Sequence, residues 1–293
     1  MKKIVLAIIA VMVPLMLSAG STDFWFRHFS VEDGLSSSAV RAIMQDKYGF
    51  MWLGTDDGLN RYDGAKFTIY KHEPNNEHSL AHNFVRTVFE DSKGHLLIGT
   101  YIGIQMYDPA TDNFTPLAKL EDTGETLESN INSFIERKNG EIWVSGNVLC
   151  KLDIKDHLLT VRKVDIAVTS PGSLFEDKKQ NVWMAKGEEG VYQLTPDNQL
   201  TLHLSKDNGY VKSICEDQRG NIYVGSIRKG LFIYDKERKT FVPIDLKEKG
   251  ELPVCFLYSG IPNELYIGTD GKGVVIYLSL IHISEPTRQE AIS

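Results

Sequence analysis

The sequence lacks the features that mark several large classes of protein. Three cysteines in 293 residues exclude a disulfide-dense scaffold, and their spacing fits no metal or redox motif. After the first twenty residues, no apolar run is long enough to span a bilayer. The formal charge of −7 lacks the basic excess that non-specific nucleic-acid binding requires. We therefore expect an ordinary globular chain with no nucleic-acid partner.

Catalytic and metal-binding motifs are also absent. The chain contains no G-x-S-x-G elbow, no phosphate-binding loop and no H-E-x-x-H sequence. His78 and His82 are four residues apart, but they lie in a Pro- and Asn-rich connection where a helix is not expected. Paired carboxylates such as Asp56-Asp57 are typical of solvated turns in an acidic protein. We expect no catalytic residue, no metal and no cofactor in this chain.

The three cysteines, Cys150, Cys215 and Cys255, are predicted to be small buried side chains in strands. A Cys215–Cys255 disulfide is the alternative, since adjacent repeats could bring these two residues together. The sequence leaves both open.

The N-terminus has the pattern of a secretory signal peptide. Lys2 and Lys3 precede an apolar stretch, 4–17, and small residues follow at 18–20. The stretch is short for a spanning helix, although an uncleaved signal anchor is the alternative. Residues 1–20 are thus predicted to be a signal peptide, and the rest of the chain to be exported to the periplasm.

An aromatic-x-Gly anchor, in places degraded, recurs six times at intervals of 40 to 46 residues. The six copies begin at Trp52, Leu97, Trp143, Trp183, Tyr223 and Tyr266. Periods near 40 with several strands in each repeat are typical of propeller blades. The pattern predicts an all-β chain, a β-propeller of four-stranded antiparallel blades, with about six repeats of a seven-bladed ring.

The second repeat shows the strand order most clearly. Val85–Asp91, His95–Thr100, Gly103–Asp108 and Phe114–Leu117 are predicted strands, separated by short turns. The fourth contains Pro116, which suits an edge position. We expect each blade to be a four-stranded meander of this kind.

Two further positions recur in the repeats. An aspartate precedes the first turn in four of them, at Asp46, Asp91, Asp177 and Asp217, and its four copies favour a turn-stabilising role over a unique catalytic one. The third and fourth repeats are weaker, with Ser145 and Ala185 in place of the anchor glycine.

The two ends of the repeat region differ from its middle. Phe26–Phe29 matches the fourth strand of a repeat, so we expect it to pair with blade material from the far end of the intact protein. Residues 278–293 follow no part of the repeat and resemble translated adapter sequence. We expect this segment to be a non-native or unstructured tail.

Three segments, 29–40, 46–55 and 58–64, resemble the two-component regulator propeller repeat. The resemblance covers residues 24–277 and is weakest in the third and fourth repeats. It implies the N-terminal fragment of the periplasmic sensor region of a hybrid histidine kinase of Bacteroidetes. Such proteins carry two seven-bladed propellers, a β-sandwich, a membrane helix and a kinase. They sense glycan fragments and induce the genes that degrade them. The resemblance further implies a membrane-anchored, homodimeric parent protein.

Candidate ligand-binding residues come from equivalent positions near the centre of the predicted ring. The second residue of the innermost strand gives a partly basic set suited to an acidic sugar: Arg41, Arg86, Asn132, Lys212 and Cys255. The alternative is that these are ordinary polar positions at a strand start. The loops that enter these strands add hydroxyl, imidazole and amide groups at Ser38, His82, Asn83 and Asn130.

Three functions remain open. A ligand-sensing propeller that binds an oligosaccharide or other small ligand is the leading hypothesis. A secreted propeller lyase or hydrolase and a non-catalytic interaction scaffold are the alternatives, since fold does not fix function. The DNA downstream separates them, because a membrane helix followed by a kinase H-box would identify a sensor.

Overall fold

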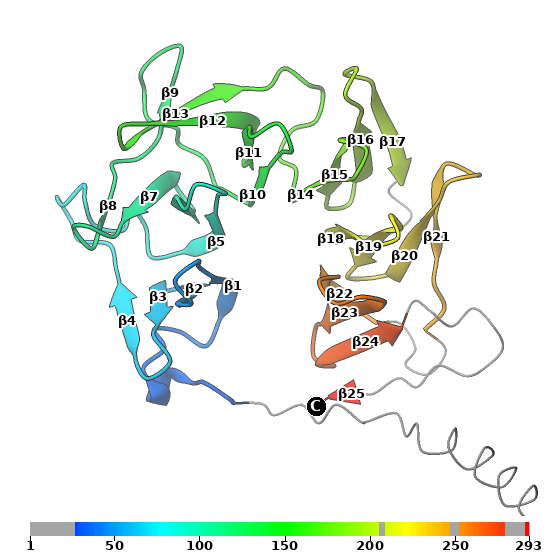
Figure 1. Ribbon diagram of the computed structural model, residues 1–293, viewed down its shortest axis with the longest axis horizontal. Helices are drawn as coiled ribbons and strands as arrows, with labels where there is room; N and C mark the ends of the chain where they lie inside the picture. The colour runs from blue at the N-terminus through cyan, green and yellow to red at the C-terminus, as the bar shows by residue number, and fades with distance from the viewer. Residues whose placement is uncertain (1–26, 205–208, 247–251, 279–290, 293) are drawn as a thin grey trace, which may run out of the picture.

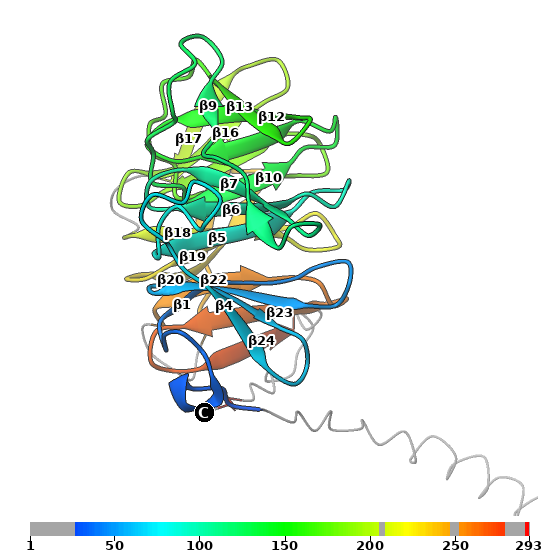
Figure 2. The ribbon, with the colours of Figure 1, turned by 90° about the vertical axis from the view of Figure 1, so that its left-hand side faces the viewer.

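The computed structural model describes residues 27–204, 209–246, 252–278 and 291–292. The predicted signal peptide lies outside these residues. Six antiparallel sheets are arranged side by side in a ring (Figure 1), and the side view shows a disc with the sheets stacked along it (Figure 2). The predicted β-propeller fold is confirmed. In the described part of the chain, no helix is both long and apolar enough to cross a membrane.

Each blade is a meander whose first strand lies nearest the centre of the ring. A 3₁₀ turn, η2 (Val31–Asp33), precedes the first blade. The first blade contains β1 (Val40–Gln45), β2 (Met51–Thr55), β3 (Gly58–Tyr62) and β4 (Phe67–Tyr70). The second contains β5 (Val85–Glu90), β6 (Leu96–Thr100), β7 (Ile104–Asp108) and β8 (Asn113–Phe114). The third contains β10 (Ser133–Glu136), β11 (Ile142–Ser145), β12 (Leu149–Lys155) and β13 (Leu158–Lys163), with β9 (Lys119–Leu120) parallel to β13.

The remaining blades repeat this order. The fourth contains β14 (Ser173–Glu176), β15 (Val182–Lys186), β16 (Gly190–Leu194) and β17 (Leu200–Leu204). The fifth contains β18 (Val211–Glu216), β19 (Ile222–Ser226), β20 (Gly230–Asp235) and β21 (Thr240–Pro243). The sixth contains β22 (Val254–Tyr258), β23 (Glu264–Thr269), β24 (Val274–Leu278) and β25 (Ala291–Ile292).

Two predicted segments differ in detail from the structure. The outer strand of blade 2, predicted over Phe114–Leu117, is limited to β8, because Pro116 has no N–H to extend the ladder. The tail contributes β25, whose two residues pair with β24, while residues 279–290 lie outside the described part.

The hydrophobic core lies between blades. Each of five buried clusters combines side chains from one face of a blade with side chains from several strands of the next blade. Between blades 1 and 2, for example, Trp52 and Leu59 pack with Val85 and Val88. A blade therefore buries its apolar faces through its neighbours, as expected for a repeat protein.

The anchor positions explain how closely the blades approach. A Cβ on Gly54 would lie 2.7 Å from the Val85 side chain of blade 2, and one on Gly225 would lie 2.4 Å from the Val254 side chain of blade 6. Glycine is thus required because the next blade's side chain fills its space. The weaker repeats still form blades, with Ser145 and Ala185 fully buried at this position.

The recurrent aspartates hold the turns, as predicted. Asp177 Oδ1 accepts the backbone N–H groups of Lys179 and Asn181, at 2.8 and 2.9 Å. Its Oδ2 accepts the indole N–H of Trp183, at 2.8 Å. The same two backbone contacts form at Asp46, Asp91 and Asp217. Each aspartate therefore holds its turn, and at Asp46 and Asp217 the second oxygen also accepts a hydrogen bond from the anchor side chain.

Blade 3 uses a different clamp, because Arg137 stands where the aspartate would be. The Trp143 indole donates to Glu141 instead, and the Arg137 guanidinium stacks on the Trp143 ring. The Lys151 ammonium beside Glu141 lowers the pKa of that carboxyl to about 2. The turn is preserved with its charges rearranged, which explains why this repeat is weak in sequence and intact in structure.

A second recurrent contact joins neighbouring blades at the ends of the inner strands of blades 2 to 5. Glu136 accepts the backbone N–H of Ser92 at 2.7 Å and the Ser92 hydroxyl at 2.6 Å. Equivalent glutamates accept the turn N–H of the preceding blade: Glu90 from Lys47, Glu176 from Lys138 and Glu216 from Lys178. We call this contact the inter-blade latch. It fixes the first turn of one blade to the inner strand of the next.

Blades 1 and 6 each have one exposed face. Ile43 on β1 is 64% exposed, whereas Leu257, at the same repeat position on β22, is 4% exposed because blade 5 covers it. On the other side of blade 6, Phe256 and Tyr258 are 60% and 53% exposed. We refer to these two uncovered faces as the seam.

The N-terminal segment and the cysteines complete the fold. Phe29 packs edge-on against Tyr62 and Phe67 of blade 1, and residues 27–29 form no strand. Phe26 lies outside the described residues, and the predicted distant partner of this segment stays a prediction. Cys150, Cys215 and Cys255 are free thiols. The disulfide alternative is thus not adopted in this structure.

Candidate functional site

The predicted candidate residues lie at the end of the ring where the inner strands begin, which we call the upper face. Four of them occupy the same irregularity in the sheet ladder. The pairing of inner and second strands skips Arg41, Arg86, Lys212 and Cys255, so each is the extra residue of a β-bulge. A bulge re-aims its side chain away from the regular pleat. The candidate position that recurs in the sequence is thus the bulge residue of the inner strand in these four blades.

The candidates differ in what surrounds them. Arg86 is half-buried and Lys212 is exposed, and neither side chain has a hydrogen-bond partner among the described residues. Asn132 donates to the Pro171 carbonyl at 3.1 Å, which links blades 3 and 4. Asn130 has a buried Oδ1 with no hydrogen-bond partner. Ser38 is exposed in the loop before β1. The residues thus form separate groups around the ring.

The strongest grouping is between blades 1 and 2. Arg41 makes a bidentate ion pair with Asp56, at 2.6 and 2.7 Å. Its guanidinium lies 5.6 Å from the centroid of the Phe84 ring, in cation–π geometry. The hydrogen bond from Arg41 holds the pKa of Asp56 below its usual value. Arg41 is therefore fixed between a carboxylate and an aromatic ring, and remains half-exposed.

Two further rings, those of His82 and Tyr101, extend this group. Tyr101 is 55% exposed, and its ring centroid lies 5.6 Å from His82 and 6.3 Å from Phe84. His82 Nδ1 accepts the backbone N–H of Phe84 at 2.9 Å, which leaves its other ring nitrogen as the donor of a neutral imidazole. Burial lowers the pKa of His82, in agreement with the neutral form.

We define the upper patch as Arg41, Asp56, His82, Phe84 and Tyr101. Asn83, also predicted, lies beside the patch but has a structural role. Its amide donates to Asp57 at 3.1 Å and accepts the His72 backbone N–H at 2.8 Å. The sequence analysis missed Asp56, Phe84 and Tyr101. An aromatic residue directly after an anchor strand, as Tyr101 is after β6, is the signal that could have found one of them.

The described residues contain no cluster of three or more His, Cys, Asp or Glu that could hold a metal ion. The upper patch offers a charged pair, one imidazole and an exposed aromatic face. Such groups bind and orient a ligand.

The comparisons with known proteins agree with this fold. The family model described as "Two component regulator propeller" matches residues 34–57, 79–101 and 205–228. A 65-residue segment is 46% identical to histidine kinase P4 of Formosa agariphila, and covers 22% of this chain and 5% of that protein.

Solved structures give the same picture. The extracellular domain of a hybrid two-component system from B. thetaiotaomicron is 23% identical, with a TM-score of 0.73, over 85% of this chain and 35% of that one. Virginiamycin B lyase from Staphylococcus aureus is 12% identical, with a TM-score of 0.59, over 83% of this chain and 85% of that one.

These likenesses differ in what they establish. Both structural matches are below 25% identity, so they show a shared fold alone. The chain also spans only a small part of the histidine kinase and about a third of the two-component domain. The family matches coincide with the first, second and fifth predicted repeats, at whose strands the structure places blades 1, 2 and 5. The chain is therefore a β-propeller in which three blades carry matches to the two-component regulator propeller repeat.

Proposed function

We propose that this chain is the ligand-sensing propeller of a hybrid two-component sensor kinase. It is exported to the periplasm, and its parent protein is anchored in the inner membrane. Three propeller-repeat matches support this, together with a segment 46% identical to a histidine kinase. The kinase belongs to the parent, and the propeller itself acts as a binding module without catalysis.

The ligand in this proposal is a glycan fragment, bound at the upper patch. The observation that carries it is the exposed Tyr101 ring, which lies beside the His82 imidazole. A tyrosine presents an apolar ring face and a hydroxyl, which suit the C–H and O–H groups of a sugar. Arg41, held by Asp56, would bind an acidic substituent. Binding would then bias the parent kinase and so the carbohydrate-utilisation genes that it controls.

A glycan array with the full chain tests this proposal, followed by calorimetry on the ligands that bind. Tyr101→Ala should weaken binding by about two- to tenfold, since stacking on an aromatic ring contributes about 0.5–1.5 kcal/mol. Tyr48→Ala is the matched control, because Tyr48 is 70% exposed in the first turn of blade 1, at the opposite end of β1. Equal affinities for the two variants, or no glycan bound by the parent chain, would contradict the proposal.

A further inference from the structure

The inter-blade latch is broken at one interface, between blades 5 and 6. Phe256 pairs with Gly268 as Thr87 pairs with Gly99, so Ser259 occupies the position that Glu90 has in blade 2. The serine side chain is two carbons shorter than glutamate and carries no charge. Its Oγ is buried and has no hydrogen-bond partner. A buried hydroxyl without a partner is uncommon and costs free energy.

The turn that this latch would hold also has a backbone N–H group without an acceptor among the described residues. Gln218 in blade 5 corresponds to Lys47, Ser92, Lys138 and Lys178, whose backbone N–H groups each donate to a glutamate. Within the described residues, the N–H of Gln218 has no acceptor. Two donors, Gln218 N–H and Ser259 Oγ–H, thus remain where the fold elsewhere places a carboxylate.

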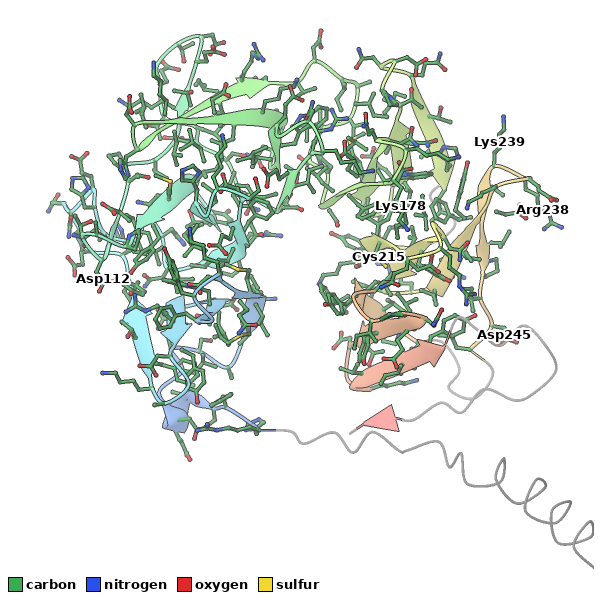
Figure 3. All side chains as sticks on the ribbon, viewed as in Figure 1. Asp112, Lys178, Cys215, Arg238, Lys239 and Asp245 are labelled. Carbon is green, nitrogen blue, oxygen red and sulfur yellow. The ribbon has the colours of Figure 1, made fainter. Side chains whose placement is uncertain are left out.

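A pocket of about 430 Å³ lies at this place, lined by Lys138, Glu176, Lys178, Glu216, Gln218 and Ser259, among others. This volume is in the range of about 300–1,000 Å³ that is typical of small-molecule sites. Figure 3 shows Lys178 between blades 4 and 5, closer to the centre of the ring than Arg238 and Lys239, which lie at its outer edge.

The charges of the pocket are mixed. The ammonium groups of Lys138 and Lys178 each donate to a backbone carbonyl of the next blade's turn, at 3.1 Å. Glu176 is paired with Arg137, at 2.9 Å. Among the residues that the structure describes, Glu216 accepts only the backbone N–H of Lys178, and burial raises the pKa of its carboxyl. A bound anion would therefore lie near two cations and near Glu216, whose negative charge is destabilised by burial. The other two carboxylates of the lining are already engaged, Glu176 with Arg137 and Asp217 with the N–H groups of its own turn.

We propose that this pocket binds a small carboxylate-bearing ligand, whose carboxylate replaces the glutamate that blade 6 lacks. The contact between Glu136 and Ser92 gives the geometry: one oxygen accepts a turn N–H and the other accepts a serine hydroxyl. Here the two donors are Gln218 N–H and Ser259 Oγ–H, now on different blades. Hydrogen bonds to a carboxylate are stronger than neutral ones, which favours the ion over an uncharged ligand. The site is separate from the upper patch and does not depend on the proposed glycan function.

Titration calorimetry of the full chain with glucuronate, glucose and acetate tests this site. Glucuronate should bind and glucose should not, because only the acid supplies the carboxylate. Acetate should compete, since it carries the recognised group alone. Glucose binding as tightly as glucuronate, or no binding by either acid, would overturn the proposal.

Two variants locate the ligand. Ser259→Glu completes the fifth latch, so it should raise the melting temperature while glucuronate binding is lost. Ser259→Ala removes one charge-assisted hydrogen bond and should weaken binding by about tenfold. Gln45→Glu is the matched control, because it introduces a glutamate at the same repeat position in blade 1 and should leave binding unchanged. Circular dichroism confirms folding, and undiminished binding by either Ser259 variant excludes the site.

Discussion

The interfaces inside the ring and the faces at the seam are built from the same repeat positions, and yet they differ in burial. Ile214 on β18 is 6% exposed because blade 4 covers it, whereas Ile43 on β1 is 64% exposed. Both are isoleucines on an inner strand, one residue after the position that pairs with the anchor glycine. The comparison shows that an inner-strand side chain is buried only where a neighbouring blade covers it. A single blade therefore buries little apolar surface by itself.

The opposite faces of the blades show the same contrast. Ser213 on β18 is buried, and its hydroxyl accepts the backbone N–H of Leu257 in blade 6 at 2.9 Å. The equivalent residue of blade 6 is Phe256, which lies exposed at the seam. A large apolar side chain here has no partner among the described residues, so this face is a candidate surface for a further blade.

The largest difference is expected when the two isoleucines are truncated. Ile214→Ala should lower the free energy of unfolding by about 2–5 kcal/mol, because it leaves a cavity in the core between blades 4 and 5. Ile43→Ala should change it by less than about 0.5 kcal/mol. Urea unfolding followed by circular dichroism measures both. Similar losses would mean that the β1 face is covered in solution.

A smaller difference is expected at the anchor glycines. A Cβ on Gly225 would lie 2.4 Å from the Val254 side chain of the next blade, so Gly225→Ala should cost about 1–3 kcal/mol through overpacking. On Gly268 the nearest atom would be Phe256 Cβ of the same blade, at 3.3 Å, and Gly268→Ala should cost less. Thermal melts of the two variants compare them. An equal cost would show that the glycine serves its own blade rather than the neighbouring one.

The sequence predicted the repeated features well and the contacts between repeats poorly. The anchors, the strand order and the turn role of Asp177 follow from local patterns that recur every 40 to 46 residues. The latch joins Glu136 to Ser92, 44 residues apart, and its geometry depends on the angle between two blades. A local sequence pattern does not predict the angle between two blades.

The candidate site divides in the same way. The bulge positions were found because they recur, with Arg41 among them. The partners that distinguish Arg41 from Lys212 come from a turn in the same blade and a loop in the next: Asp56 and Phe84. Their proximity follows from the fold, so the sequence indicated the position without indicating the patch.

The smallest effect on stability is expected at Phe256, where a polar residue would match the serines of blades 3, 4 and 5. Phe256→Ser should change the free energy of unfolding by less than about 0.5 kcal/mol, because the ring is already 60% exposed. It should also reduce self-association, since it removes apolar area from the seam. Leu257→Ser is the control, as this neighbouring side chain is 4% exposed and its change should unfold the blade. Analytical ultracentrifugation gives the association constant. Unchanged association would mean that another face of the molecule mediates self-association. A large loss of stability would mean that Phe256 is covered by protein in solution.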